Sequence, residues 1–349
     1  MLTVTKGQSS QGTLMFDEAA ESGDAVRRQL SENVDQIARI GARLRDRPPV
    51  AAVTVGRGSS DHAAVFAKYL LETRQGVLTS PSGLSVTSLY KSSLRLDNTL
   101  CIAVSQSGKS PDLVSAVKGM RQSGAFVVAL VNAEDSPLAE NADETIPLRA
   151  GPEISVAATK SYITALSTIA QLIAHWGQEQ QLLQEIEKLP DQLNTAWELD
   201  WSAASDAFAS ETSMFVLGRG LGYGLAREAA LKFKETCSLH AEAYSAAEVL
   251  HGPAALIAEG FPILAFMQND ETSRSTSDTL LSLAARGANV FTAGLSDPLV
   301  TELPTLKAHP VLQPILMAQS FYKMVNTTAL ARGRDPDRPP NLAKITETV

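Results

Sequence analysis

The chain has 349 residues, of which 44% are hydrophobic and 19% are charged, a balance typical of a folded globular protein. Its formal net charge of −8, with no long basic run, argues against a general nucleic-acid binder. The two cysteines, Cys101 and Cys237, exclude a disulfide framework and a cysteine metal cluster, so we expect a reducing, cytoplasmic setting.

Neither a leader nor a membrane span is expected. The start, MLTVTKGQSSQGTLMF, lacks the charged beginning and apolar core of a secretory signal. The longest apolar stretch, YITALSTIAQLIAHW (162–176), is interrupted by polar residues and is too short to cross a bilayer. We therefore expect a soluble protein with no membrane partner.

Predicted strands and helices alternate along the chain. Short strands that are apolar throughout, separated by helices, indicate a parallel sheet covered on both faces. In chain order we expect a helix at Phe16–Arg47, a strand at 50–56, a helix at Asp61–Arg74, a strand at 99–105, a helix at Asp112–Ser123 and a strand at 125–132.

Two motifs of the first half of the chain recur in the second half. VTVGRGSS (53–60) resembles FVLGRGLG (215–222), and CIAVSQSGKS (101–110) resembles ILAFMQNDET (263–272), both at an offset of 162 positions. Two matches at one offset indicate a duplicated α/β domain. The predicted divisions are 1–47 for an N-terminal segment and helix, 48–180 for the first domain, 181–204 for a helical linker, 205–333 for the second domain and 334–349 for a tail.

In the first copy, SQSGKS (105–110) follows the predicted strand directly. Ligands of parallel sheets bind beyond the carboxyl ends of strands, where helix N-termini present free N–H groups. Three serine hydroxyls, together with a glycine that lets the backbone approach, suit a phosphate. Asp270 and Glu271 stand in the second copy and would repel one, so we predict a phosphate site in the first copy alone.

Two other interpretations of this segment remain. GKS at 108–110 resembles the end of an ATP-binding loop, but Ala103 stands where that pattern needs a glycine. SQSG by itself also fits a helix-capping turn without a ligand. Ser59 and Ser60 follow the neighbouring strand, reach the same sheet edge and favour a ligand.

The second copy carries the residues suited to proton transfer. In LAREAALKFKETC (225–237), Glu228, Lys232 and Glu235 lie on one stripe of a predicted helix. Such a stripe is also typical of an exposed ion-pair face. However, the helix begins at the edge predicted to bind phosphate, and His251 precedes a Gly-Pro turn and belongs on a loop. Carboxylate, ammonium and imidazole groups beside a sugar phosphate can move protons next to a carbonyl, and no metal or other cofactor is expected.

Several segments, in order, resemble the sugar isomerase (SIS) domain family, and in particular the two-domain isomerase half of glutamine–fructose-6-phosphate aminotransferases. The likeness runs from about Thr13 to Lys344. It implies an α/β fold of two tandem SIS domains, each a flavodoxin-like parallel sheet with helices on both faces. The segments are GRGSS (56–60), SQSGKSPD (105–112), EISVAATKSY (153–162), EAALKFKE (228–235), HAEAYSAAEVLHGP (240–253) and PPNLAK (339–344).

The resemblance also implies roles for individual residues. Glu235 matches the base that moves a proton between C1 and C2 of a hexose 6-phosphate, and Glu228 and Lys232 match its acid/base partners. His251 matches the residue that opens the sugar ring from the neighbouring subunit, which implies a homodimer, and Lys344 matches a lysine able to form a Schiff base. The implied phosphate-binding positions are Ser60, Ser105, Gln106, Ser107 and Ser110, with Ser59 beside them, and the implied sugar-binding positions are Gly58, Val156, Ala157 and Ala343.

Two departures from the family pattern bear on the activity. Residue 2 is Leu where the aminotransferases carry a nucleophilic cysteine, so we expect no use of glutamine. Lys109 and Ser110 replace an acidic residue and a threonine, as in stand-alone SIS deaminases. The expected reaction is therefore conversion of glucosamine 6-phosphate to fructose 6-phosphate and ammonia.

Two alternatives stay open. One is an isomerase or deglycase acting on another 6-phosphosugar, such as galactosamine 6-phosphate or a sugar–amino-acid adduct. The other is a non-catalytic sugar-phosphate sensor. Sensors of this kind usually carry a DNA-binding domain, and the segment before Pro48 is short for that purpose.

Overall fold

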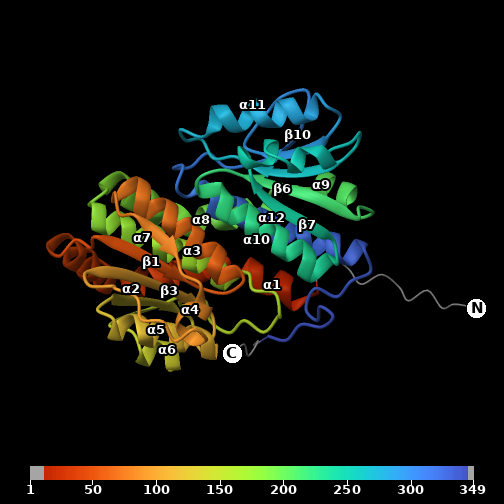
Figure 1. Ribbon diagram of the computed structural model, residues 1–349. Helices are drawn as coiled ribbons and strands as arrows, with labels where there is room; N and C mark the ends of the chain where they lie inside the picture. The colour runs from red at the N-terminus through yellow and green to blue at the C-terminus, as the bar shows by residue number, and fades with distance from the viewer. Residues whose placement is uncertain (1–11, 345–349) are drawn as a thin grey trace, which may run out of the picture.

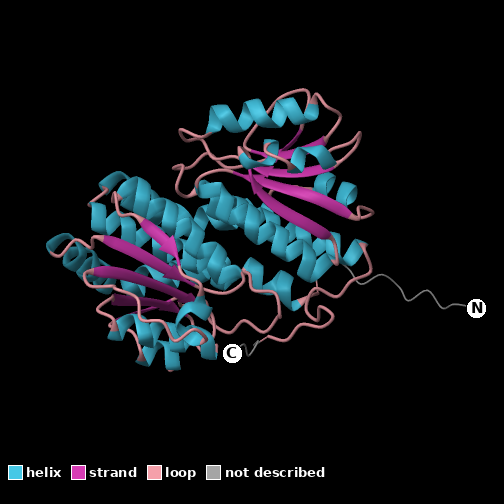
Figure 2. Cartoon of the chain, viewed as in Figure 1, coloured by secondary structure: helices cyan, strands magenta, loops and turns pink. Residues whose placement is uncertain are grey.

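The computed structural model describes residues 12–344; the predictions that fall on 1–11, Leu2 among them, and on 345–349 lie outside the described residues. Within the described range, ten strands form two five-stranded parallel sheets, each flanked by helices (Figures 1 and 2). The first sheet has the spatial order β2-β1-β3-β4-β5, with β1 (Ala51–Val55), β2 (Thr79–Pro81), β3 (Thr99–Ser105), β4 (Phe126–Val131) and β5 (Glu144–Pro147).

The second sheet repeats this topology. Its order, β7-β6-β8-β9-β10, is the same flavodoxin-like arrangement, which confirms the predicted fold class. Strands β1 and β6 begin 162 positions apart, as the duplicated motifs require. Its strands are β6 (Ser213–Gly218), β7 (His240–Ser245), β8 (Pro262–Phe266), β9 (Asn289–Ala293) and β10 (Thr301–Leu303).

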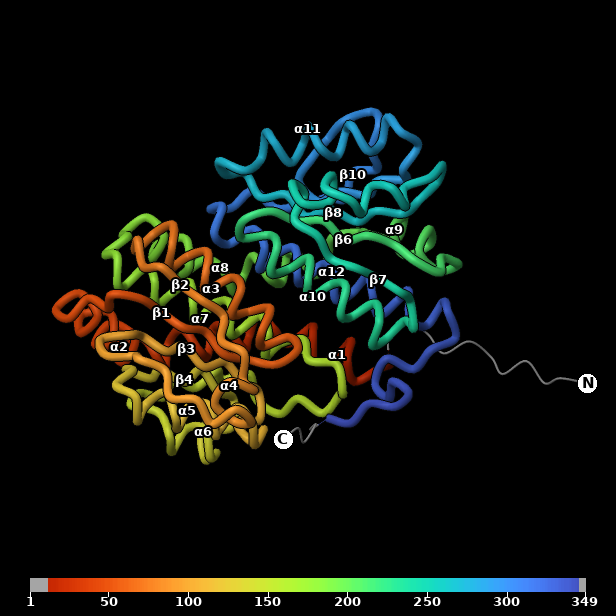
Figure 3. The backbone as a smooth tube through the Cα atoms, viewed as in Figure 1, coloured from red at the N-terminus to blue at the C-terminus, as the bar shows by residue number. Residues whose placement is uncertain are grey.

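Helices from both copies share one hydrophobic core between the sheets. The helices α3 (Ser59–Arg74) and α7 (Lys160–Gly177) of the first copy pack with α10 (Leu221–Cys237) and α12 (Gln313–Ala331) of the second (Figures 1 and 3). Helix α7 is buried on nearly every side because neighbouring elements cover it all round. No helix in residues 12–344 is long and apolar enough to cross a membrane.

Smaller cores cover the outer faces of the two sheets. Over the first sheet lie α4 (Leu84–Ser88), α5 (Pro111–Gln122) and α6 (Pro137–Glu140), and over the second lie α11 (Ser273–Ala284) and the short 3-10 turns η1 (Glu248–Leu250) and η2 (Pro253–Leu256). The linker forms α8 (Gln180–Glu198) and α9 (Ser202–Phe208). The predicted domain boundaries themselves stay a prediction.

The structure corrects two sequence-based expectations. The single helix predicted at Phe16–Arg47 is two helices, α1 (Leu14–Ala20) and α2 (Ser22–Asp46), because the chain turns at Glu21. The sequence also missed the edge strands β2, β5, β7 and β10, which are short or, like HAEAYS in β7, lack an apolar run because an edge strand is only partly covered. Both differences arise from packing that local periodicity does not record.

A tight glycine turn joins strand to helix in each copy. A Cβ on Gly56 would lie 2.7 Å from the backbone of Ser60, and one on Gly218 would lie 2.4 Å from the oxygen of Gly222. Gly58 has a positive φ of 53°, which glycine adopts without strain. This turn starts α3 at Ser59, two residues earlier than predicted, and so places serines in the first turn of the helix.

Candidate active site

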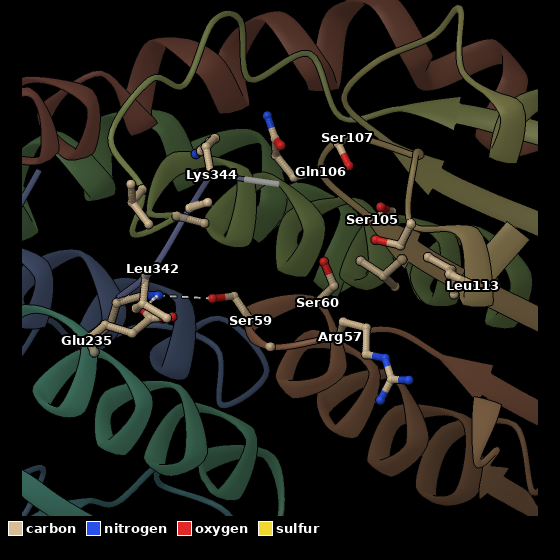
Figure 4. A pocket seen from close by; sticks show the side chains of 17 residues that line it. Arg57, Ser59, Ser60, Ser105, Gln106, Ser107, Leu113, Glu235, Leu342 and Lys344 are labelled. Carbon is tan, nitrogen blue, oxygen red and sulfur yellow. Dashed lines mark hydrogen bonds and ion pairs between the residues drawn. The ribbon is translucent and has the colours of Figure 1, made fainter. Parts of the chain in front are cut away.

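One cavity of about 330 Å³ lies where the carboxyl ends of β1 and β3 face α10 and the C-terminal tail. Its volume is within the usual range for small-molecule sites. Figure 4 shows serine hydroxyls from the first copy on one side and Glu235 from the second copy on the other. The lining residues are Arg57, Gly58, Ser59, Ser60, Val104, Ser105, Gln106, Ser107, Ser110, Leu113, Val156, Ala158, Lys232, Glu235, Leu342, Ala343 and Lys344.

Hydroxyl groups and helix starts make up one end of the cavity. The Ser105 hydroxyl accepts a hydrogen bond from the backbone N–H of Gly108 at 3.0 Å, and the Ser107 hydroxyl accepts one from Lys109 at 3.3 Å. Gly108 has a φ of 63°, and a Cβ there would lie 2.2 Å from the Ser136 hydroxyl, so the turn requires glycine. Helix α5 begins just after Ser110 and α3 just after Gly58. Hydroxyl donors beside two helix N-termini suit an anion.

The opposite end holds a carboxylate and a buried ammonium group. Lys232 Nζ donates to Glu235 Oε2 at 2.5 Å and to Ser59 Oγ at 3.1 Å. The Lys232 side chain is only 1% exposed, whereas that of Glu235 is 20% exposed and reaches the cavity. Ser59 therefore follows the glycine turn after β1 and also contacts Lys232 of α10.

Glu228 lies behind the cavity wall instead of lining it. Its side chain is fully buried, and Oε1 accepts hydrogen bonds from Ser59 Oγ and the Tyr322 hydroxyl, both at 3.0 Å. Oε2 lies 3.0 Å from His62 Nδ1, and Oε1 lies 3.4 Å from Lys232 Nζ. The carboxylate is therefore surrounded by partners from its own chain and does not line the cavity.

Burial and neighbouring charges shift the pKa values of Glu228 and Lys232 in opposite directions. Burial raises the pKa of Glu228, but the Lys232 ammonium and the His62 contact outweigh it, so the pKa lies below its usual value. Burial lowers the pKa of Lys232, but Glu228 and Glu235 outweigh it and raise this pKa above its usual value. Both groups are charged at neutral pH, which keeps an ammonium next to the Glu235 carboxylate.

A loop and the tail form the roof of the cavity. Val156 and Ala158 line it, whereas Ala157, predicted to contact the sugar, is fully buried in the main hydrophobic core. Lys344 also lines the cavity, and its Nζ donates to the carbonyl oxygen of Ser155 at 2.6 Å. Ala343 lines the cavity as well, and its predicted contact with a sugar stays a prediction.

Hydrogen bonds to the N-terminal segment hold the loop and the tail that cover the cavity. The Asp337 carboxylate accepts hydrogen bonds from the backbone N–H groups of Leu14 and Met15, each at 2.7 Å. The Glu18 carboxylate accepts from Ser155 N at 3.2 Å and also from Ile154 N. Sequence reasoning missed these residues, because their partners lie more than a hundred positions away in the chain. It also missed Arg57, Val104, Leu113, Ala158 and Leu342 in the wall, although all of them except Leu113 directly adjoin a predicted site residue.

His251 lies away from this cavity. It is exposed at the end of η1 and is absent from the cavity wall of its own chain. Its predicted role across a dimer interface therefore stays a prediction. Within residues 12–344, no group of three or more His, Cys, Asp or Glu side chains is arranged to hold a metal ion.

Comparison with known proteins places these features in a family. The SIS domain model matches residues 50–175 and 207–320. A glutamine–fructose-6-phosphate aminotransferase (isomerizing) from Aeropyrum pernix is 36% identical over 91% of this chain and 55% of its own length. The chain thus spans about half the length of the curated relatives it matches.

Two solved structures share the fold over nearly the whole chain. A candidate phosphosugar isomerase from Silicibacter pomeroyi DSS-3 is 42% identical, with a TM-score of 0.90 over 93% of this chain and 100% of its own. The C-terminal domain of glucosamine-fructose-6-phosphate aminotransferase from Francisella tularensis is 26% identical, with a TM-score of 0.84 over 95% of this chain and 100% of its own.

Proposed function

Because this chain belongs to the SIS-domain family, we propose that it converts a phosphorylated sugar by moving a proton between two adjacent carbons. The observation that carries the proposal is the cavity that joins the serine turns of the first copy to Glu235 of the second. The names of its relatives, which include fructose 6-phosphate aminotransferases and a candidate phosphosugar isomerase, support a hexose 6-phosphate as the substrate.

The phosphate is the proposed anchor. Ser60, Ser105, Ser107 and Ser110 offer hydroxyls, and the starts of α3 and α5 favour an anion between them. With the phosphate held there, the sugar chain extends toward Glu235 and the roof. Anchoring a remote group in this way orients the reacting carbons and lowers the entropic cost of reaction.

Glu235 is the proposed base. With the sugar ring open, its carboxylate takes the proton from C2 and returns a proton to C1. Lys232 holds this carboxylate through a hydrogen bond of 2.5 Å and supplies positive charge beside the electron-rich intermediate. Ser59 and Glu228 in turn hold Lys232. General base catalysis of this kind contributes about 10²–10⁴-fold in rate.

The specific reaction we propose is deamination of glucosamine 6-phosphate. Transfer of the C2 proton to C1, with a proton passing from the amine nitrogen to O1, converts the open-chain amino aldehyde into a C2 imine. One water molecule then hydrolyses the imine to fructose 6-phosphate and ammonia. The replacement of the family's acidic residue and threonine by Lys109 and Ser110 supports this choice.

Two further residues complete the proposal. Lys344 can form a Schiff base with the ketose only after it leaves the carbonyl oxygen of Ser155. His251, exposed on its loop, assists ring opening in the neighbouring subunit of a homodimer. Isomerisation or deglycation of another 6-phosphosugar would use the same groups.

The deciding experiment combines two assays with one matched pair of variants. Ammonia release is measured with glucosamine 6-phosphate, and exchange of the C1 protons of fructose 6-phosphate is followed by NMR in D₂O. We expect Glu235→Gln to lower both rates about 10²–10⁴-fold. Glu271→Gln, a change to an exposed carboxylate of the second copy, should leave both unchanged.

Each alternative has its own outcome. Exchange without ammonia release supports an isomerase and contradicts the deaminase. Turnover of galactosamine 6-phosphate or of a sugar–amino-acid adduct alone supports a different substrate. Binding of phosphosugars without any exchange, unaffected by Glu235→Gln, would contradict the enzymatic proposal and support a sensor.

A further inference from the structure

A buried carboxylate stands in the first turn of the helix that points at the proposed phosphate site. Asp112 is the second residue of α5, and its side chain is only 1% exposed. Its Oδ1 accepts a hydrogen bond from the backbone N–H of Leu113 at 2.8 Å. Ser110, the N-cap of the same helix, and Leu113 both line the cavity.

This placement creates an electrostatic conflict. The N-terminus of a helix carries roughly half a positive charge, which favours an anion there. A buried carboxylate in the same turn cancels that charge and repels an incoming phosphate across a medium that screens poorly. Without a positive charge beside Asp112, the serine hydroxyls and the start of α5 would attract an anion only weakly.

Arg57 resolves the conflict. Its Nε donates to Asp112 Oδ2 at 3.0 Å, and its Nη2 donates to the same oxygen. Arg57 belongs to the glycine turn after β1 and lines the cavity. Figure 4 shows its guanidinium directed away from the hydroxyls of Ser60 and Ser105, so its contact is with Asp112.

We infer that Arg57 sets the affinity of the site for phosphate by neutralising Asp112, a role that the family resemblance did not assign. The inference rests on the proposed phosphate site but not on the identity of the sugar. The second copy offers a natural contrast: Arg219, 162 positions after Arg57, donates to a neutral group, the hydroxyl of Ser275, at 2.9 Å.

The test measures binding of inorganic phosphate by calorimetry, together with KM and kcat for glucosamine 6-phosphate. We expect Arg57→Gln to weaken phosphate binding and to raise KM by about tenfold or more, with kcat changed by less than about threefold, since the charge acts on binding. Arg57→Lys keeps the charge but loses the paired donors, so its phosphate affinity and KM should lie between those of the wild type and of Arg57→Gln. Arg219→Gln is the matched control and should leave all three quantities unchanged.

The double variant Arg57→Gln/Asp112→Asn is decisive. It removes both charges, and we expect it to recover most of the phosphate affinity that Arg57→Gln loses. Thermal unfolding of every variant identifies any that fails to fold, in which case Arg57→Lys against Arg57→Gln carries the test. Unchanged binding in Arg57→Gln, or no recovery in a folded double variant, would overturn the inference.

Failure of the proposed function gives a different result. In that case the wild-type protein binds neither inorganic phosphate nor any 6-phosphosugar, before any variant is made. If the wild type binds phosphate and Arg57→Gln binds it equally well, only the inference about Arg57 fails.

Discussion

The same strand-to-helix turn is open in the first copy and filled in the second. Beside Gly58, a Cβ would meet only Leu231, at 3.8 Å, and the space above is the cavity. Beside the equivalent Gly220, a Cβ would meet Thr272 at 3.2 Å and Gln268 at 3.3 Å. A duplicated backbone therefore does not duplicate a binding site, because side chains decide whether the turn stays open.

The groups that fill the second turn satisfy one another. Gln268 Nε2 donates to the carbonyl oxygen of Arg219 and to Asp270 Oδ2, each at 2.8 Å. Asp270 Oδ1 accepts from the N–H and the hydroxyl of Thr272 at 2.8 and 2.6 Å. The Asp270 carboxylate thus uses, within the chain, the donors that the first copy offers to a ligand.

In the equivalent helices α3 and α10, it is the second copy that carries the charged side chains. Helix α10 carries Glu228, Lys232 and Glu235, whereas the positions 162 earlier in α3 are Phe66, Leu70 and Thr73. The helices pack against each other, so Ser59 in the turn of the first copy meets Lys232 in α10 of the second. The cavity therefore combines serines that only the first copy carries with charged side chains that only the second copy carries.

The largest expected effect comes from removing the buried charge of α10. Lys232→Met leaves Glu228 fully buried without its ammonium partner, and we expect a loss of about 3–5 kcal/mol in the free energy of unfolding. Leu70→Met, at the equivalent place in α3, should cost less than about 1.5 kcal/mol. Urea unfolding of both variants measures the two free energies of unfolding. Equal losses would mean that Lys232 contributes to stability through packing alone and not through its charge.

A second prediction closes the open turn. Gly108 corresponds to Asp270, and Gly108→Asp would bring a carboxylate into the cradle and a Cβ to 2.2 Å from the Ser136 hydroxyl. We expect binding of inorganic phosphate to weaken at least about 100-fold, because charge repulsion adds to the strain of the positive φ. Calorimetric titration checks this, and retained affinity would place the phosphate elsewhere.

The reverse change tests the filled turn. Asp270→Gly removes the acceptor of the Thr272 and Gln268 hydrogen bonds, and we expect a loss of about 1–3 kcal/mol in stability. Turnover by the folded variant should be unchanged, because this turn lies outside the cavity. Loss of turnover at full stability would show that the second turn takes part in the reaction.

The smallest effect concerns acid stability. Since the pKa of Glu228 is lowered on folding, its contribution to stability is present above its usual value of 4.5 and is lost as the pH falls through the lowered value. A tenfold difference in acid dissociation between the folded and unfolded states corresponds to about 1.4 kcal/mol. The free energy of unfolding, measured from pH 7 to pH 3, should therefore fall less steeply for Glu228→Gln than for the wild type, and parallel curves would contradict the buried ion pair.

Much of the fold could be predicted because it is recorded locally. Strand β3 begins and ends where the apolar run TLCIAVS does, and β1, β4 and α5 agree to within a residue or two. The break between α1 and α2 at Glu21 could not be predicted, since helical periodicity continues through it. The edge strands, β7 among them, were missed because each is short or only partly covered and so carries no long apolar run.

The sequence by itself determined the duplicated α/β unit, the serine turn after β3 and the acid/base stripe of α10, because strand hydrophobicity, helix spacing and motif offset are local properties. Only the tertiary structure decided that Glu228 lies behind the cavity wall, that Ala158 and not Ala157 lines the cavity, and that Arg57 pairs with Asp112. Those outcomes depend on which side chains meet across loops and between the two copies, where burial and opposing charges, not local spacing, determine each position.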